Sequence, residues 1–299
     1  MDHPPAYDHP EAGTMLNLAV TGIASGVAYA AIGVCLVLIY QISNLINVSM
    51  GIVAGIGAFT TVSVYDSGVS LIVSGLVGVA VGALVAAAQG LIFAFWFSDA
   101  STTTRTAVSI AMTVTLLAAA QRLFGHDPRL FPLLLDGRAV TIGSVRVQWV
   151  NIIAVFVLVL VAAGLRLGQQ HTRMGAKMRA VSLRPQTAEL LGVRSRRIVV
   201  GVWACAGAAA TAGLLVVTPT RQSDLTSMTL LVVPALAAAL LGGLKDYRLV
   251  IVAGLAIGLL EALALSWDVL AQYRQALSFL VIVVGLLFTQ RAVVWDERR

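Results

Sequence analysis

Charged residues are scarce in this chain of 299 residues. Asp, Glu, Lys and Arg together make up 11% of it, whereas a typical soluble domain carries about 25%. A soluble protein of this length needs a polar coat that so few charges cannot supply. The composition therefore excludes a soluble enzyme, a secreted disulfide-rich module and a disordered chain.

Residues that build metal and nucleotide sites are also few. Cys35 and Cys205 both lie in apolar stretches, so small buried side chains explain them better than a disulfide or a metal cluster. The four histidines are dispersed and have no ligand spacing. The chain has no GxxxxGK(S/T) phosphate loop, no HExxH and no CxxC. We therefore expect no enzymatic activity, no metal and no cofactor in this chain.

Long apolar runs fill most of the sequence, which is 59% hydrophobic and has a mean hydropathy of +0.91. A bilayer core of about 30 Å is spanned by about 20 apolar helical residues. Nine stretches are predicted as spans: Leu16–Tyr40, Leu45–Val64, Val69–Phe97, Thr106–Phe124, Trp149–Leu167, Ile198–Thr218, Met228–Leu244, Leu249–Ser266 and Tyr273–Thr289. The seventh is short and contains Pro234, so we expect a kink or a partial span. The predicted fold class is an all-α polytopic transmembrane helical bundle of about 8–10 spans.

The polar segments predict how the chain is oriented. Residues 1–14 are acidic and proline-rich and are expected to form a disordered external tail, with residues 15–299 forming a single transmembrane domain. The segment 166–197 holds eight basic residues against the single acid Glu189, so the positive-inside rule places the loop 168–197 in the cytoplasm. The basic C-terminus returns to the same side. This bias also explains the net charge of +6, and we expect no nucleic acid partner.

Small residues recur four positions apart in several spans. Such pairs allow helix backbones to approach closely and indicate a tightly packed bundle. They are Gly22/Gly26, Gly51/Gly55, Gly78/Gly82, Gly164/Gly168 and Gly254/Gly258.

Polar residues at membrane depth are candidates for a transport path. Glu261 is the one ionisable residue well inside a predicted span; it either faces a pore or holds a partner helix. The segment from Gln41 to Gly51 interrupts two spans and contains Asn44, Asn47 and Ser49. These side chains either line a cavity beside a broken helix or form a plain turn at the cytoplasmic interface.

The basic loop contains two predicted short helices. Met174, Met178 and Val181 recur at i, i+4 and i+7, which predicts an exposed apolar stripe on the first helix. Pro185 near the start and Gly192 just past the end delimit the second. The stripe favours docking of a soluble protein, the alternative being a basic loop lying on anionic lipid headgroups.

Three stretches together resemble the LivH-type permease subunits of bacterial ABC importers for branched-chain amino acids. The first, GIASGVAYAAIGVCLVLIYQISNLINVSMGIVAGIGAF, contains an Asn-x-x-x-Gly turn from Asn47 to Gly51. The second, TRMGAKMRAVSLRPQTAELLGVRSRRI, is similar to the cytoplasmic loop that meets the ATPase subunit. The third, ALLGGLKDYRLVIVAGLAIGLLEAL, matches a Gly-Gly turn followed by a small-residue helix with a Glu.

The resemblance implies an ATP-driven importer in the bacterial cytoplasmic membrane, with this chain as its lipid-embedded permease domain. It implies two cytoplasmic ATPase subunits that bind the ATP, a second, LivM-like permease chain and an external solute-binding protein. The residues expected on the translocation path are Asn44, Asn47, Ser49 and Glu261. Those expected to couple to the ATPase are Lys177, Arg179, Ala188, Glu189 and Gly192.

The chain departs from the family's usual residues inside the Asn-x-x-x-Gly turn, which here reads Val48, Ser49, Met50, and after the Gly-Gly turn, which here reads Lys245 to Arg248. Both departures bear on the cargo. Branched-chain amino acids are the expected solutes, with urea or short amides as the alternative. An ion-coupled secondary transporter and a membrane scaffold without transport activity are the other classes considered.

Overall fold

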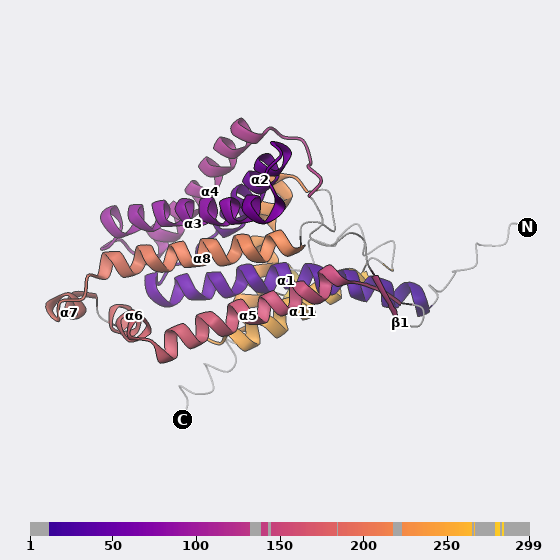
Figure 1. Ribbon diagram of the computed structural model, residues 1–299. Coiled ribbons are helices and arrows are strands. Elements are labelled where there is room, and N and C mark those ends of the chain that lie inside the picture. Colours follow the sequence, from indigo (N-terminus) through magenta and orange to yellow (C-terminus); the bar gives the residue numbers. More distant parts are fainter. Residues whose placement is uncertain are drawn as a thin grey trace, which may run out of the picture.

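The computed structural model describes residues 12–131, 139–142, 145–183, 185–217, 223–264, 266, 279–281 and 283. Within them the chain is a helical bundle, as predicted (Figure 1). The helices are α1 (Ala12–Ser43), α2 (Met50–Asp66), α3 (Leu71–Trp96), α4 (Thr102–Phe124), α5 (Trp149–His171), α6 (Arg173–Leu183), α7 (Pro185–Leu190), α8 (Ser195–Val217), α9 (Leu225–Leu230), α10 (Val232–Leu241) and α11 (Tyr247–Ala264). One antiparallel hairpin, β1 (Ala139–Ile142) with β2 (Val145–Gln148), was not expected.

Six of the described helices are long and apolar enough to cross a membrane, and α2 and the α9–α10 pair are shorter apolar segments. Together they correspond to the first eight predicted spans. The ninth, Tyr273–Thr289, lies almost entirely outside the described residues, as do residues 1–11 of the predicted tail. Helix α1 begins at Ala12, so residues 12–14 are helical and the prediction that they belong to a disordered tail is wrong.

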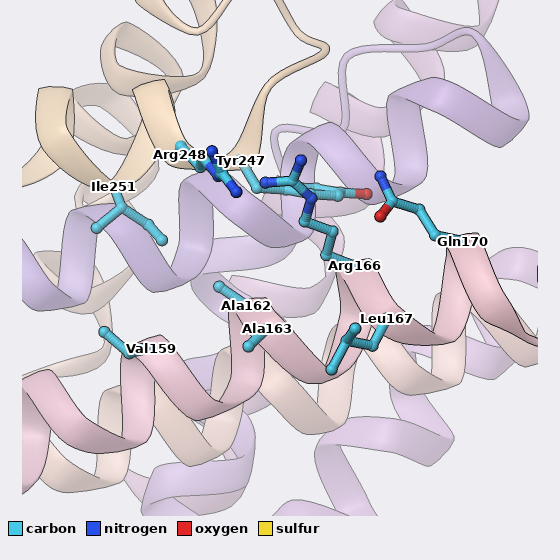
Figure 2. A pocket seen from close by; sticks show the side chains of 9 residues that line it. All are labelled: Val159, Ala162, Ala163, Arg166, Leu167, Gln170, Tyr247, Arg248 and Ile251. Atoms are coloured by element: carbon cyan, nitrogen blue, oxygen red, sulfur yellow. The ribbon is translucent and has the colours of Figure 1, made fainter.

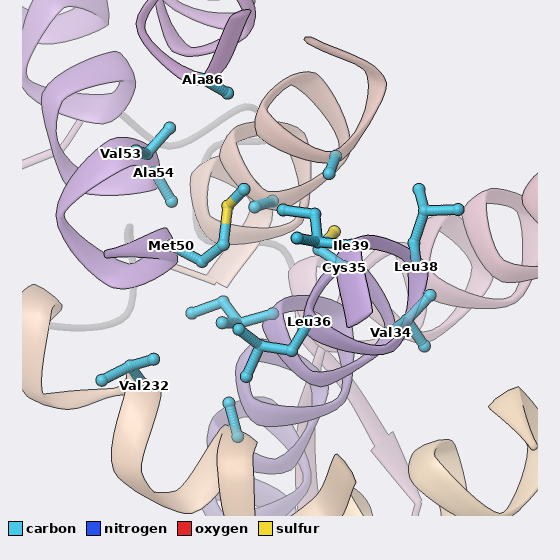
Figure 3. Close-up of a cluster of buried hydrophobic side chains, with 14 of the residues drawn as sticks. Val34, Cys35, Leu36, Leu38, Ile39, Met50, Val53, Ala54, Ala86 and Val232 are labelled. Atoms are coloured by element: carbon cyan, nitrogen blue, oxygen red, sulfur yellow. The ribbon is translucent and has the colours of Figure 1, made fainter. Parts of the chain in front are cut away.

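Helix α1 runs through the centre of the bundle, and 94% of its span is buried, against 17% for α4 and for α5. A helix that is apolar on every face fits such a central position. Figure 1 shows α1 between α8 and α11, with α3 beyond α8. Its residues Val34 to Ile39 form the middle of the main hydrophobic core, where Met50 from α2 and Val232 from α10 meet them (Figure 3).

Glycines explain how closely the helices pack. A Cβ on Gly26 would lie 2.7 Å from Leu255 Cα, and one on Gly254 would lie 2.8 Å from Ala30 Cα. The predicted pairs of α1 and α11 therefore face each other along one seam. In contrast, a Cβ on Gly164 or Gly168 of α5 would meet nothing within 4 Å, so that pair serves no contact between described residues.

Two predicted spans have different limits in the structure. Helix α2 begins at Met50 rather than at Leu45, because residues 44–49 form an irregular turn. The seventh span is broken at Leu231, between α9 and α10. Pro234 has no N–H and cannot donate a hydrogen bond to the carbonyl three to four residues upstream. The helix is therefore interrupted just upstream of the proline.

Candidate translocation and coupling sites

The turn between α1 and α2 carries three of the predicted path residues, of which Asn44 is exposed and Asn47 and Ser49 are buried. Asn44 has a φ of 47°, and its backbone N–H donates to Tyr40 O at 2.8 Å. This is the left-handed residue that ends a helix, a role for which Asn is well suited. Its side chain is exposed, so Asn44 lies apart from the buried polar residues that follow it.

Asn47 and Ser49 are fully buried beside Gln89 of α3. Asn47 Oδ1 accepts from both Ser49 N, at 3.0 Å, and Ser49 Oγ, at 2.6 Å. The Ser49 hydroxyl in turn accepts from Gln89 Nε2 at 2.8 Å. These three residues, the polar cluster, connect the turn to α3. Gln89 was missed at the sequence level, although it is the single amide side chain in α3.

One donor of the polar cluster has no partner. The two bonds to Asn47 Oδ1 fix the orientation of that amide, and Asn47 Nδ2 is then left buried without a hydrogen bond among the described residues. Such an unmade bond costs about 1–3 kcal/mol.

Glu261 belongs to a separate site. It lies in α11, is 7% exposed, and accepts a hydrogen bond from the buried Tyr29 hydroxyl of α1 at 2.6 Å between Tyr29 Oη and Glu261 Oε2. Tyr29 lies 14 residues before the end of α1, about 20 Å along the helix, so Glu261 is remote from the turn that carries the polar cluster. The four predicted path residues therefore occupy an exposed helix end, one buried cluster and one interhelical contact.

The two predicted loop helices are present as α6 and α7, called here the elbow. Helix α7 ends in a Schellman motif: Gly192 N donates to Glu189 O at 2.9 Å and Val193 N to Ala188 O at 3.0 Å. Gly192 has a φ of 80°, which glycine adopts without strain. The sequence prediction of this helix end is confirmed.

The surface of the elbow differs from the predicted stripe. Val181 is 1% exposed and packs into the core, so the prediction of an exposed Met174–Met178–Val181 face is wrong at that residue. The buried Ala188 packs in the same way. The apolar side chains that do reach the surface are Leu183, Leu190 and Leu191, which are 81%, 88% and 77% exposed.

The elbow also carries exposed charged residues. Lys177, Arg179 and Glu189 are all exposed, and Arg179 Nη1 donates to Gln169 O at the end of α5. The elbow lies at one end of the bundle, opposite the β hairpin (Figure 1), where a soluble protein can reach it.

A group of hydrogen-bonded polar side chains, the polar joint, connects α1, α5 and α11 at the elbow end of the bundle. The Tyr247 hydroxyl of α11 is 3.0 Å from both Gln41 Oε1 of α1 and Gln169 Oε1 of α5, and Gln169 Nε2 donates to Gln41 Oε1 at 3.2 Å. Gln41 Nε2 also donates to Lys245 O at 3.1 Å. Because α5 continues directly into α6, this joint connects the elbow to the central helix.

Known proteins match most of the length of this chain. The family described as "Branched-chain amino acid transport system / permease component" matches residues 18–286. The high-affinity branched-chain amino acid transport system permease protein BraD of Pseudomonas aeruginosa is 26% identical, over 95% of this chain and 97% of its own length. The corresponding protein LivH of Escherichia coli is 25% identical, over 91% and 92%.

A solved structure, PsaBC from Streptococcus pneumoniae in complex with Fab, matches with a TM-score of 0.43 and 15% identity over 90% of this chain and 89% of that chain. The apolar helices packed around α1 define a polytopic integral membrane protein. The family match over residues 18–286 then identifies it: the chain belongs to the branched-chain amino acid ABC permeases. It is a transport permease and not an enzyme.

Proposed function

We propose that this chain is a permease subunit of an ATP-driven importer that moves branched-chain amino acids into the cytoplasm. Its partners in this proposal are two ATPase subunits at the elbow, a second, LivM-like permease chain and an extracytoplasmic solute-binding protein. The chain itself holds no cofactor, and ATP is bound by the ATPase subunits. The relatives named for branched-chain amino acid transport support this choice of cargo.

The observation that carries the proposal is the elbow. It combines exposed leucines, a basic surround and a rigid connection to the bundle. A force applied by a closing ATPase dimer at α7 is transmitted through α6 and the polar joint to α1, α5 and α11. A packed element of this kind converts a small rigid-body tilt into alternating access.

The polar cluster supports the path. Asn47 Nδ2 offers a buried donor for the carboxylate that every amino acid carries, and Ser49 and Gln89 hold that amide in place. Glu261 is a second polar point, between α1 and α11. Because an unpaired buried donor rejects solutes that lack an acceptor, this arrangement selects polar cargo over apolar cargo.

Uptake measurements test the whole proposal. The chain is reconstituted into liposomes with the ATPases, second permease and binding protein of the same system, and labelled leucine uptake is measured with ATP. We expect uptake that requires ATP and survives collapse of the ion gradients. Uptake of urea or short amides instead of leucine would correct the cargo, and uptake driven by an ion gradient without the ATPases would overturn the mechanism.

Substitutions at the elbow test the coupling. Replacing Leu190 with Glu removes an exposed apolar contact, so we expect loss of ATPase co-purification with normal membrane insertion. The matched control is Leu130→Glu, which changes another exposed leucine, 71% exposed against 88% for Leu190, at the hairpin end. Glu189→Lys and Gly192→Trp are expected to separate ATP hydrolysis from uptake. Unchanged transport in all three elbow variants would overturn the docking assignment.

Sidedness is tested by labelling. In this proposal the loop 168–197 and the C-terminus face the cytoplasm. Ser182 of the elbow and Ser67 after α2 are both exposed and lie at opposite ends of the bundle. A membrane-impermeant maleimide applied to intact cells is expected to label Ser67→Cys and to spare Ser182→Cys. The reverse pattern would overturn the orientation.

A further inference from the structure

A cavity between α5 and α11 lies outside both sites described above. It has a volume of about 420 Å³ and opens at the surface between the two helices. Arg166 and Gln170 of α5 and Tyr247 and Arg248 of α11 line one part of it (Figure 2). Apolar side chains, among them Ile251, line the rest.

Arg166 and Arg248 place two positive charges at the polar part of the cavity, with no acid among the described residues that line it. The guanidinium groups of Arg166 and Arg248 have no hydrogen bond or ion pair with any described residue, and the lining contains no carboxylate. The nearest acid in the sequence, Asp246, accepts instead from the Arg248 backbone N–H at 2.9 Å and so begins α11. Two like charges at one cavity, beside a helix N-terminus, favour an anion.

The position of the charges along the helices indicates the membrane interface. Arg248 is the second residue of α11, and Arg166 lies one to two turns from the end of α5. Ile251 and Val159 follow one to two turns deeper in their helices. The cavity is therefore cationic near the ends of the two helices and apolar further along them, beside α5, of whose span only 17% is buried among the described residues.

We propose that this cavity binds an anionic phospholipid. The phosphodiester of the headgroup lies between Arg166 and Arg248, Gln170 adds a hydrogen-bond donor, and an acyl chain covers Ala163 and Ile251. Basic pockets between transmembrane helices have this preference for anionic headgroups. Because Tyr247 contributes both to this cavity and to the polar joint, the bound lipid also stabilises the elbow end of the bundle.

Native mass spectrometry of the purified full chain tests the proposal. The chain is titrated with phosphatidylglycerol and with phosphatidylcholine of the same acyl chains. We expect selective retention of phosphatidylglycerol, and about 30-fold weaker binding in the double variant Arg166→Gln/Arg248→Gln, from the usual contribution of two arginines at an anionic surface. Arg194→Gln is the matched control, since Arg194 is exposed at the same end but does not line the cavity.

Two further arms separate the lipid from other anions and from a folding defect. Ala163→Trp keeps both charges but fills the apolar part of the cavity, so it is expected to abolish phosphatidylglycerol retention. Glycerol phosphate, which lacks acyl chains, is expected not to displace the lipid. Equal retention of phosphatidylcholine, wild-type retention in the double variant or in Ala163→Trp, or displacement by glycerol phosphate would each overturn the proposal.

Discussion

The Tyr29 hydroxyl donates to Glu261 Oε2 at 2.6 Å and so connects the central helix α1 to α11 inside the membrane-spanning part of the protein. Both residues are buried. A carboxyl group at this depth is costly without a polar partner. The hydrogen bond therefore explains how a glutamate is accommodated between two apolar helices that pack closely at glycines.

Tyr29→Phe is expected to destabilise the bundle, because it leaves a buried carboxyl oxygen without this donor. Hydrogen bonds to groups of this kind contribute about 1.5–3 kcal/mol. Thermal unfolding of the purified protein in detergent measures the loss. The control is Tyr65→Phe, since Tyr65 is 40% exposed and its hydroxyl has no hydrogen bond among the described residues. An equal melting temperature for Tyr29→Phe and wild type would contradict the assignment.

The glycine seam between α1 and α11 makes a second prediction about stability. A Cβ on Gly26 would lie 2.7 Å from Leu255 Cα, a backbone atom that cannot move alone. Overpacking of this kind costs about 1–3 kcal/mol, so Gly26→Ala is expected to lower the melting temperature. Gly164→Ala is the opposite case: its Cβ meets nothing within 4 Å, and the gain in helix propensity is about 1 kcal/mol. Opposite signs for the two variants are the expected result.

Much of the fold could be predicted from the sequence, because apolar runs at bilayer length specify helices locally. Pro185 and Gly192 delimited α7 for the same reason: the conformation that each favours is a local property of the backbone. A kink in the span that contains Pro234 was predicted, but its position was not; the structure places the break at Leu231, since the missing hydrogen bond acts upstream of the proline.

The sites were predicted less completely, because they depend on residues far apart in the chain. Ser49 and Gln89 are 40 positions apart, and no periodicity connects them. The stripe through Val181 had the correct spacing for one helix face, but only the packing of α6 against the bundle decides that Val181 is buried. The exposed leucines of the elbow were missed for the same reason.

The start of α9 makes the fold sensitive to pH. Asp224 Oδ2 accepts from Thr226 N at 3.1 Å and from Ser227 N at 3.3 Å, in a capping box. Partial burial alone would raise the pKa of Asp224, but the hydrogen bonds from Ser227 and Thr226 outweigh it and hold the pKa below its ordinary value. The stabilisation is therefore present above the unfolded pKa of about 3.9 and is lost as the pH falls through the folded pKa.

Asp224→Ala tests this dependence. We expect it to cost about 1 kcal/mol at neutral pH, and the difference from wild type is expected to shrink as the solution is acidified below the ordinary carboxyl pKa. Amide hydrogen exchange in Leu225–Leu230, measured at neutral pH and below the ordinary carboxyl pKa, reports the local effect. Asp224→Asn retains an acceptor oxygen and does not titrate, so its exchange should be close to wild type at neutral pH. A cost for Asp224→Ala that is independent of pH would contradict the role of the carboxylate.

Arg105 at the start of α4 closes the ends of two other helices. Its Nε donates to Phe97 O at 2.8 Å, its Nη1 to Ser43 O at 2.9 Å, and its Nη2 to Ser98 O. Only the planar guanidinium reaches these divergent carbonyls at once, because a lysine ammonium is a single point of donation. Arg105→Lys is therefore expected to lower the melting temperature nearly as much as Arg105→Ala. Arg122→Lys, which changes an exposed arginine in the same helix, should have no effect on the melting temperature. A wild-type melting temperature for Arg105→Lys would mean that charge rather than geometry stabilises these helix ends.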